Sequence, residues 1–335
     1  MNSKIKKILF LLLCIFETVF VFSVTKKEPI WFKDFKSIYP ETKYIVQIGS
    51  GETEEQAQNS SIALIARFFQ TNVSSNLSTK MVSILKNDKA FDELTVIDDI
   101  EVTSTVNLFA LKFEETYYSK KEKQYYSLAY INRDSAWDLY KSQIEMSKST
   151  FYSFFNKAEE TSEPFIKYIE YKQAWVSAKD FLEKLEYGNL LNPKKNSIYS
   201  KDREVISSLP ILMKDISKTA SICVSVKGDY NNILGNSVKQ LFINEGFEFS
   251  KTGTYTLFIG IEPNVEGNEP LTIYPSVYVE LSNSKGDIFF TYDYTHHEKT
   301  IAYALETAQR KVYPKIAEII STEIKVRLND ELNKQ

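Results

Sequence analysis

Cysteine and histidine are scarce in this chain. Its 335 residues include two cysteines and two histidines. Cys14 lies in an apolar N-terminal stretch that we expect to be removed, which leaves Cys223, and one cysteine cannot close an intramolecular disulfide. Because Cys223 stands inside the apolar run of residues 220–226, we predict that it is a buried strand residue.

A positive stripe long enough to bind a nucleic acid is missing as well. The chain has 41 lysine and arginine residues against 44 aspartate and glutamate residues, a formal net charge of −3. The basic residues are scattered among acidic ones and form no positive stripe of the kind that neutralises phosphates. A nucleic-acid ligand is therefore not expected.

A long apolar run occurs only near the N-terminus. Residues 8–16 are apolar and follow a short segment with three lysines, which is typical of a signal peptide. Val21 and Ser23 occupy the positions that a signal peptidase reads. We therefore predict a signal peptide over residues 1–23. An uncleaved anchor is the alternative, although residues 8–24 are short for a bilayer span and include Glu17.

The predicted leader determines the expected location of the protein. Leucines precede Cys14 where a lipobox needs a small residue, so lipidation is not expected. Cleavage after Ser23 leaves about 310 residues, more than one ordinary domain, with a net charge of −5 because three lysines and Glu17 are lost. We expect the periplasm or the periplasmic face of the outer membrane, and leave membrane association open.

Motifs of catalysis and cofactor binding are not apparent. Gly49 and Gly51 stand between a predicted strand and helix, as in a nucleotide-binding turn. No third glycine follows, and Glu52, Glu54 and Glu55 put carboxylates where a phosphate would bind. A tight turn before a capped helix is the favoured interpretation. No cofactor is expected.

The two histidines, His296 and His297, are adjacent and have Asp293, Tyr294 and Glu298 nearby. A metal site there would lack the further nitrogen or sulfur ligands that zinc normally recruits. A serine triad would need one of the same histidines, and no GxSxG motif presents a serine. We therefore nominate no catalytic, cofactor-binding or metal-ligating residue.

Hydrophobic residues make up 43% of the chain and aromatic residues 14%, which predicts a folded protein with a large core. In the first half we predict a strand over 44–48 and a helix over 53–75. Thr53 and Gln56 form its capping box, and its buried face carries Ile62, Ile65, Ala66, Phe69 and Val73. Further predicted strands span 94–102, 106–115 and 124–131, in an antiparallel sheet with a turn at 119–123.

The rest of the chain is predicted to contain a pair of helices, a linker and a second set of strands and helices. Two amphipathic helices are predicted over 133–188, with a corner at Pro164 and an end at Gly188 and Pro193. Residues 189–203 are interpreted as a linker. In the last part we predict strands over 221–226, 254–262, 271–282 and 288–295, a helix over 232–245, and a helix over 298–329 that Pro314 bends or divides.

These elements predict an α+β fold, with two strand-helix-three-strand-helix units joined by a helical hairpin. The expected domains are a signal peptide (1–23), an N-terminal α+β domain (29–132), the hairpin (133–188), the linker (189–203) and a C-terminal α+β domain that ends in a long helix (204–332).

The N-terminal domain carries an ordered set of motif residues. They are Pro29, Trp31, Tyr39-Pro40, the strand 44–48 with Gly49 and Gly51, and a helix with Ala57, Ala63, Ala66 and Val73. This pattern resembles the Lpp-twenty-like family and covers about the first 50 residues after the leader. The resemblance implies an envelope protein, since many members are outer-membrane lipoproteins and related domains occur in periplasmic proteins of flagellar assembly. It implies no enzyme.

Tyr117, Tyr118, Tyr125 and Tyr126 flank a basic turn and form a candidate interaction surface for a protein or a glycan. The alternative is that they pair across strands and stabilise the sheet. Our first hypothesis is a non-enzymatic interaction or assembly factor, whose partners are envelope proteins such as outer-membrane or flagellar components. The alternatives are a hydrolase acting on cell-wall material and a binding module for lipid or glycan.

Overall fold

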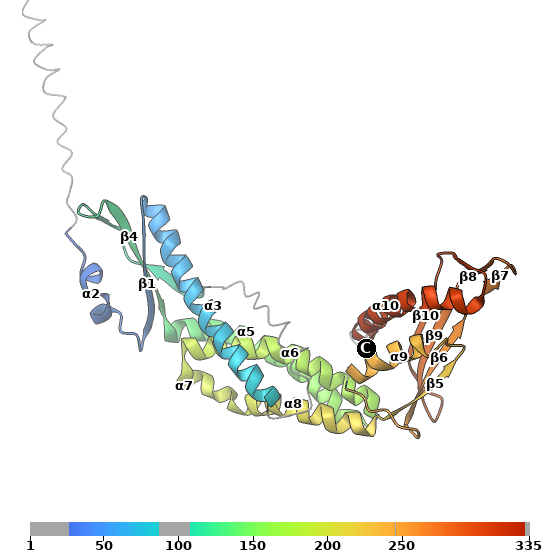
Figure 1. The fold of residues 1–335 in the computed structure, drawn as a ribbon. Coiled ribbons are helices and arrows are strands. Elements are labelled where there is room, and N and C mark those ends of the chain that lie inside the picture. Colours follow the sequence, from blue (N-terminus) through green and yellow to red (C-terminus); the bar gives the residue numbers. More distant parts are fainter. Residues whose placement is uncertain (1–26, 87–107, 245, 332–335) are drawn as a thin grey trace, which may run out of the picture. The chain divides into compact units, whose positions relative to one another are not determined.

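The computed structural model describes residues 27–86, 108–244 and 246–331. It has the predicted α+β class (Figure 1). The described chain divides into two compact units, one formed by residues 27–68 and 108–135, the other by the remaining described residues. The signal peptide and the strand predicted over 94–102 lie outside the described residues.

Unit 1 contains a four-stranded antiparallel sheet with the order β1-β4-β2, and β3 also pairs with β4. The strands are β1 (Tyr44–Gly51), β2 (Leu111–Phe113), β3 (Tyr117–Ser119) and β4 (Gln124–Asn132). The predicted antiparallel pairing is confirmed for these strands. Within the described part of the predicted strand 106–115, which starts at residue 108, the strand is limited to β2, and β3 is an addition.

One face of this sheet is covered by the short helix α2 (Ile30–Ile38). Trp31 and Tyr39 are buried there against Leu128. Aromatic and β-branched side chains complete the cluster: Phe32, Phe35, Tyr44, Val46, Ile48, Tyr117, Tyr126 and Tyr130. Trp31, a residue of the predicted motif, therefore belongs to the core of unit 1.

The opposite face of the sheet touches helix α3 (Glu54–Lys86). Gly49 and Gly51 belong to β1 and do not form the predicted tight turn. A Cβ atom on Gly49 would lie 2.2 Å from the backbone nitrogen of Ser61, and one on Gly51 would lie 2.8 Å from the backbone nitrogen of Ala57. The glycines are needed because strand and helix backbones approach each other closely.

The start of α3 has the predicted Thr53 cap, while the reciprocal bond of Gln56 goes to the residue before Thr53 and not to Thr53 itself. The backbone nitrogen of Gln56 donates to Thr53 Oγ1 (3.2 Å), and the side-chain oxygen of Gln56 accepts from the backbone nitrogen of Glu52 (2.9 Å). The helix extends to Lys86, well beyond the predicted end at residue 75. Every fourth residue is buried: Ala57, Ser61, Ile65, Phe69, Val73, Leu77 and Met81.

A spacing of four residues advances the buried stripe by about 40° per step around a helix. The stripe therefore winds around α3, whose first part belongs to unit 1 and whose part from Phe69 onward belongs to unit 2. In unit 2, Phe69 stacks on Tyr187 with ring centroids 4.4 Å apart.

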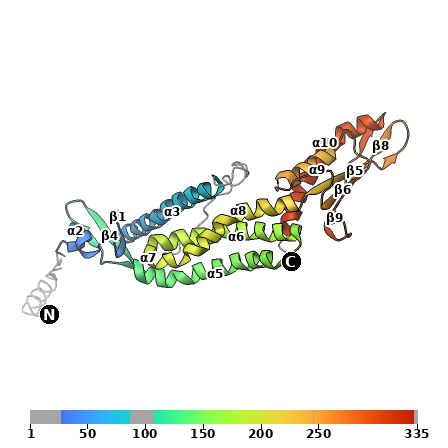
Figure 2. The same ribbon diagram turned by 90° about the horizontal axis from the view of Figure 1, so that it is seen from below.

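Unit 2 begins with a bundle of long helices (Figure 2). The predicted pair is confirmed as α5 (Arg133–Glu160) and α6 (Pro164–Leu191), with the corner at Pro164. Glu163 caps α6 by accepting a hydrogen bond from the backbone nitrogen of Ile166 (2.9 Å). Phe151 of α5 and Phe181 of α6 pack with ring centroids 5.8 Å apart.

The predicted linker over 189–203 is wrong, because these residues continue the bundle. Asn192 caps a short helix, α7 (Pro193–Asn196), which leads through η1 (Ser197–Tyr199) into α8 (Ser200–Thr219). Gly188 does not end α6, which continues to Leu191. The missing side chain of Gly188 makes room for the side chain of Asn196. The Asn196 side chain donates to the backbone oxygen of Leu185 (2.9 Å).

A buried carboxylate links three helices of unit 2. The Glu186 side chain on α6 is 1% exposed and forms ion pairs with Lys80 of α3 and Arg203 of α8. Arg203 also donates to the backbone oxygen of Leu185 (3.1 Å). Because a buried charge must be paired, this carboxylate fixes which parts of α3 and α8 lie beside α6.

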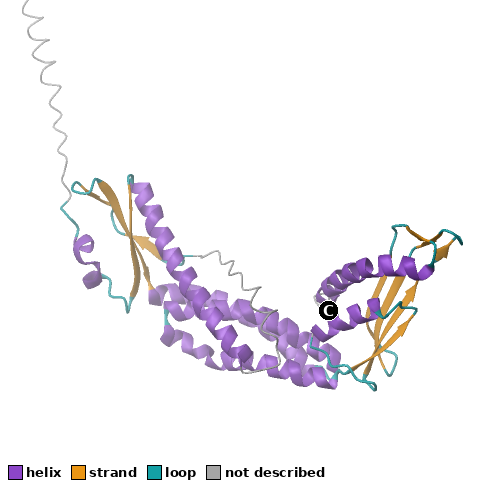
Figure 3. Ribbon diagram, in the orientation of Figure 1, coloured by secondary structure: helices purple, strands orange, loops and turns teal. Residues whose placement is uncertain are grey.

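The C-terminal part of unit 2 contains a four-stranded sheet with the order β10-β9-β6-β5. Its strands are β5 (Ile222–Lys227), β6 (Tyr255–Glu262), β9 (Ser276–Asn283) and β10 (Ile288–Thr295). β5 and β6 are parallel, and the other pairs are antiparallel. Helices α9 (Ile233–Asn244) and α10 (Leu305–Glu331) lie on one face (Figure 3).

Two predictions for this part need correction. The strand predicted over 271–282 is interrupted at Pro275, which has no amide proton for a ladder, and becomes β8 (Leu271–Ile273) and β9. The helix predicted from residue 298 begins at Leu305, because β11 (Thr300–Ala302) precedes it and forms a small sheet with β8 and β7 (Val265–Glu266). α10 continues through Pro314 and is not divided there.

The contact between β1 and α3 predicts a specific sensitivity. Replacing Gly49 with alanine forces β1 and α3 apart, so we expect the free energy of unfolding to fall by about 2 kcal/mol or more. Chemical denaturation of the purified protein measures this change. Ser50→Ala, at the exposed neighbouring position, is the control and should stay near the parent value. Equal stability of both variants would contradict the close approach.

The buried carboxylate of Glu186 predicts a second effect. Glu186→Gln leaves Lys80 and Arg203 without their anion, and we expect a loss of about 3 kcal/mol in the free energy of unfolding. Glu160→Gln, on an exposed position of α5, serves as the control and should change stability by less than about 0.5 kcal/mol. Similar losses for both variants would show that the ion pairs are not the cause.

Candidate functional site

The four tyrosines predicted as an interaction surface are brought together by one strand pair. The register of β3 and β4 places Tyr117 opposite Tyr126 and Tyr118 opposite Tyr125. Successive residues of a strand point to opposite faces of a sheet. The hairpin therefore separates the four tyrosines into two pairs, one on each face.

The pair Tyr117 and Tyr126 belongs to the core cluster beneath α2. The ring of Phe32 lies 4.9 Å from Tyr117 and 4.8 Å from Tyr126, measured between centroids. The hydroxyl of Tyr126 donates to Glu122. Since both rings are packed by α2, these two tyrosines stabilise the fold, and the predicted interaction surface is reduced by half.

The second pair, Tyr118 and Tyr125, lies on the α3 face of the sheet. Its rings are 4.9 Å apart at an interplanar angle of 53°, and Tyr118 is 43% exposed. Tyr125 is opposite Gly51 at the end of β1, just before α3 begins. Phe113 of β2, which pairs with Ala129, lies on the same face and is 38% exposed. Phe113 was not among the predicted surface residues, although strand alternation places it beside them.

A positively charged turn adjoins this pair. Lys120, Lys121 and Lys123 are exposed, and Glu122 among them is bonded to Tyr126. The backbone nitrogen of Lys123 donates to the backbone oxygen of Ser119 (2.7 Å) and closes the turn. We call Tyr118, Tyr125 and the three lysines the hairpin site. Aromatic rings and lysine side chains are therefore adjacent at this end of the hairpin.

The alanines of the motif that resembles the Lpp-twenty-like family differ in burial. Ala57 is buried at the contact between α3 and β1, Ala66 is half-buried, and Ala63 is exposed. Trp31, Gly49, Gly51 and Ala57 therefore pack unit 1 together, whereas the exposed Ala63 has no packing role there.

The two histidines point in different directions. His296 is 5% exposed, and its Nδ1 lies 3.0 Å from the hydroxyl of Tyr294. Burial lowers the pKa of His296 below its usual value. His297 is exposed. In the described residues no three His, Cys, Asp or Glu side chains gather in a way that could hold a metal ion.

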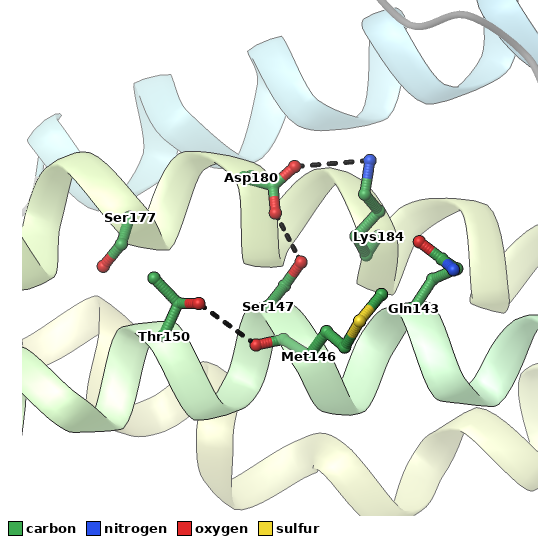
Figure 4. Close-up of a pocket in the computed structure, with 7 residues that line it drawn as sticks. All are labelled: Gln143, Met146, Ser147, Thr150, Ser177, Asp180 and Lys184. Carbon is green, nitrogen blue, oxygen red and sulfur yellow. Dashed lines mark hydrogen bonds and ion pairs between the residues drawn. The ribbon is translucent and has the colours of Figure 1, made fainter.

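A hollow of about 310 Å³ lies between α5 and α6 (Figure 4). It is lined by Gln143, Met146, Ser147, Thr150, Ser177, Asp180 and Lys184. Ser147 donates to one oxygen of Asp180, and Lys184 pairs with the other oxygen at 3.3 Å.

This hydroxyl and carboxylate do not form a catalytic arrangement. Ser147, Asp180 and Lys184 lie inside the long helices α5 and α6. The backbone amides there are used in helical hydrogen bonds and cannot stabilise an oxyanion. The side chain of Asp180 is 56% exposed. We therefore interpret the hollow as a groove between packed helices.

None of the helices in the described residues combines the length and the apolar character that crossing a membrane requires.

The division of the tyrosines predicts two classes of variants. Tyr117→Ala and Tyr126→Ala remove packed rings from the core cluster, and each should lower the free energy of unfolding by about 2 kcal/mol. Tyr118→Ala and Tyr125→Ala remove rings from the pair on the α3 face and should cost less than about 1 kcal/mol. Thermal and denaturant unfolding of the four variants measure the difference. A uniform loss across all four would mean that the pairs are equivalent.

No family model matches the chain, and no curated protein matches it, so the resemblance to the Lpp-twenty-like family stays an expectation. Among solved structures, a minor lipoprotein from Acinetobacter baumannii is similar over 32% of this chain and 94% of its own, with 14% identity and a TM-score of 0.24. The secreted protein HP1454 from Helicobacter pylori is similar over 83% of this chain and 97% of its own, with 10% identity and a TM-score of 0.37. Neither likeness establishes a shared fold, because both TM-scores lie below 0.5.

Proposed function

We propose that this chain is an exported, non-enzymatic protein of the bacterial cell envelope, and that it acts as an interaction or assembly factor in the periplasm or at the outer membrane. The partner is an envelope protein with an acidic surface, which binds the hairpin site of unit 1. An outer-membrane or flagellar component is the partner that the family resemblance suggests.

Export is supported by the sequence. Residues 1–23 combine a basic start, an apolar core and an acceptable cleavage position after Ser23. The motif around Trp31, Gly49 and Gly51 resembles a family of envelope proteins. Both observations concern the N-terminal part of the chain.

The observation that carries the binding role is the ring pair of Tyr118, which is exposed, and Tyr125, which is half-buried. Tyrosine gives a large contact area at a low cost in conformational entropy, because it has two side-chain torsions. Such rings are enriched where proteins bind one another. The pair lies at the start of α3, on a hairpin whose other face is anchored by Phe32. A rigid support of this kind reduces the entropy lost on binding.

A binding role also agrees with the polar groups inside the described chain. Glu186 is held by Lys80 and Arg203, and Asp202 is held by Lys148 (2.9 Å) and by the hydroxyl of Tyr152 (2.7 Å). These charges are used to join helices. Within the described residues we therefore assign them to the structure and not to a reaction.

Site-specific photo-crosslinking in cells tests the proposal. A photoreactive phenylalanine analogue replaces Tyr118, and we expect a discrete adduct with one envelope protein that Tyr125→Ala weakens at least several-fold. The same analogue at Tyr303, which is 80% exposed on the far end of the sequence, is the control and should not give that adduct. Reversing the charge of Lys120, Lys121 and Lys123 should also weaken it, more strongly at low salt.

Two results would refute the proposal. One is a mature protein that retains Met1 and fractionates with cytosolic proteins. The other is an adduct from position 118 that neither Tyr125→Ala nor the charge reversal changes, because the partner would then bind elsewhere.

A further inference from the structure

The two faces of the C-terminal sheet differ in chemistry. The face beneath α9 and α10 is fully apolar at its centre, and its buried residues include Leu257, Ile259, Val277, Val279 and Leu281. The sheet is mixed, with antiparallel pairs from β6 to β10, and antiparallel strands with one covered face normally have a polar second face. The second face of this sheet is polar around a centre of two aromatic rings.

We call this second face the open face. By strand alternation it carries Cys223, Ser225 and Lys227 of β5; Thr256, Phe258, Gly260 and Glu262 of β6; Ser276, Tyr278, Glu280 and Ser282 of β9; and Thr291, Asp293 and Thr295 of β10. No leucine, isoleucine, valine or methionine occurs in this set. Ile288 stands at its corner, next to the turn that joins β9 and β10.

Phe258 and Tyr278 lie side by side on adjacent strands, with ring centroids 6.3 Å apart and an interplanar angle of 54°. The register places Gly260 directly opposite Tyr278. A Cβ atom on Gly260 would come within 3.1 Å of the Phe258 ring. The missing side chain of Gly260 therefore leaves room for the Phe258 ring beside Tyr278.

Hydrogen-bonding groups surround the rings. The hydroxyl of Tyr278 donates to Glu280, and this bond raises the pKa of Tyr278 to about 12. The hydroxyl is therefore protonated at neutral pH, and the second carboxylate oxygen of Glu280 is able to accept. Asp293 is opposite Tyr278 on the other side. Together with Glu262 and one cation, Lys227, these groups give the open face a negative charge.

The chemistry of the open face selects among ligands. Its carboxylates repel nucleic acids and anionic lipids. Its centre has no leucine, isoleucine, valine or methionine, and Ile288 stands only at the corner, which is unfavourable for acyl chains and for the apolar centre of a protein interface. A sugar ring, in contrast, has an apolar C–H face that packs on an aromatic ring and a rim of hydroxyls that bond to carboxylates, which accept strongly.

We propose that the open face binds an uncharged glycan chain, with Phe258 and Tyr278 as the platform for sugar rings and Glu280 and Asp293 as acceptors for their hydroxyls. This inference relies on the proposed function only for export, which would expose the protein to envelope polysaccharides. The binding site is separate from the hairpin site, which belongs to unit 1.

The two rings also have a structural role that the experiment must separate. An aromatic ring next to a glycine on a neighbouring strand shields the exposed backbone and stabilises the sheet. If this were the only role, Phe258→Ala and Tyr278→Ala would lower the thermal midpoint of unfolding, and the parent protein would bind none of the oligosaccharides.

Titration of the full mature chain with neutral oligosaccharides tests the proposal. The probes are N-acetylchitotetraose, cellohexaose and maltohexaose, followed by calorimetry and by NMR of aromatic side chains. We expect at least one probe to bind, with shifts in the rings of Phe258 and Tyr278. Loss of either ring by Phe258→Ala or Tyr278→Ala should raise Kd about tenfold, and Glu280→Gln should raise it several-fold.

Two matched variants serve as controls. Tyr303→Ala removes an exposed tyrosine from β11–α10, outside the open face, and should leave Kd unchanged. Tyr278→Phe keeps the ring and should stay within about threefold of the parent. If an alanine variant unfolds, the aromatic shifts of the parent and the Kd of Glu280→Gln decide.

The proposal is overturned if none of the probes binds at millimolar concentration, or if binding shifts resonances away from Phe258 and Tyr278. It is also overturned if the folded ring variants bind as tightly as the parent. Crosslinking from Tyr118 is independent of these results, so failure of glycan binding and failure of the proposed function are distinguishable.

Discussion

Alternation of side chains along strands, combined with strand register, is the constraint on which both candidate binding surfaces depend. In unit 1 the pairing of β3 with β4 separates four adjacent tyrosines, so that Tyr117 is packed by Phe32 while Tyr118 is exposed. In the C-terminal sheet the same alternation leaves Phe258 and Tyr278 on the face that α9 and α10 do not cover. A shift of one residue in either register would exchange the faces.

Close backbone contacts and buried charges hold the supporting elements in place. Gly49 and Gly51 let α3 approach β1, and this contact positions the end of the strand opposite Tyr125. Glu186 connects α6 to α3 and α8 through Lys80 and Arg203. The contact between β1 and α3 tolerates little change because it has no space for a methyl group. The ion pairs of Glu186 tolerate little change because loss of one partner leaves a buried charge unpaired.

The two surfaces have related aromatic groups and opposite charge. The hairpin site combines Tyr118 and Tyr125 with lysines, which favours an acidic protein. The open face combines Phe258 and Tyr278 with carboxylates and hydroxyls, which favours a neutral glycan. An exported protein with both sites could hold an envelope protein and a polysaccharide at once, and such linkage increases the effective concentration of one for the other.

The sequence alone determined the local elements, because the helix cap at Thr53, the corner at Pro164 and the periodic helices depend on neighbouring residues. It did not reveal α8, because the polar lysine-rich segment before α8 has the composition of a linker. In the structure Asn192 caps the short helix α7 in this segment, and the side chain of Asn196 is buried against α6. It named four tyrosines, but only strand register separated the pair on the α3 face from the packed pair. The open face, too, is a product of tertiary structure, because residues 258, 278 and 293 become neighbours only when β6, β9 and β10 pair.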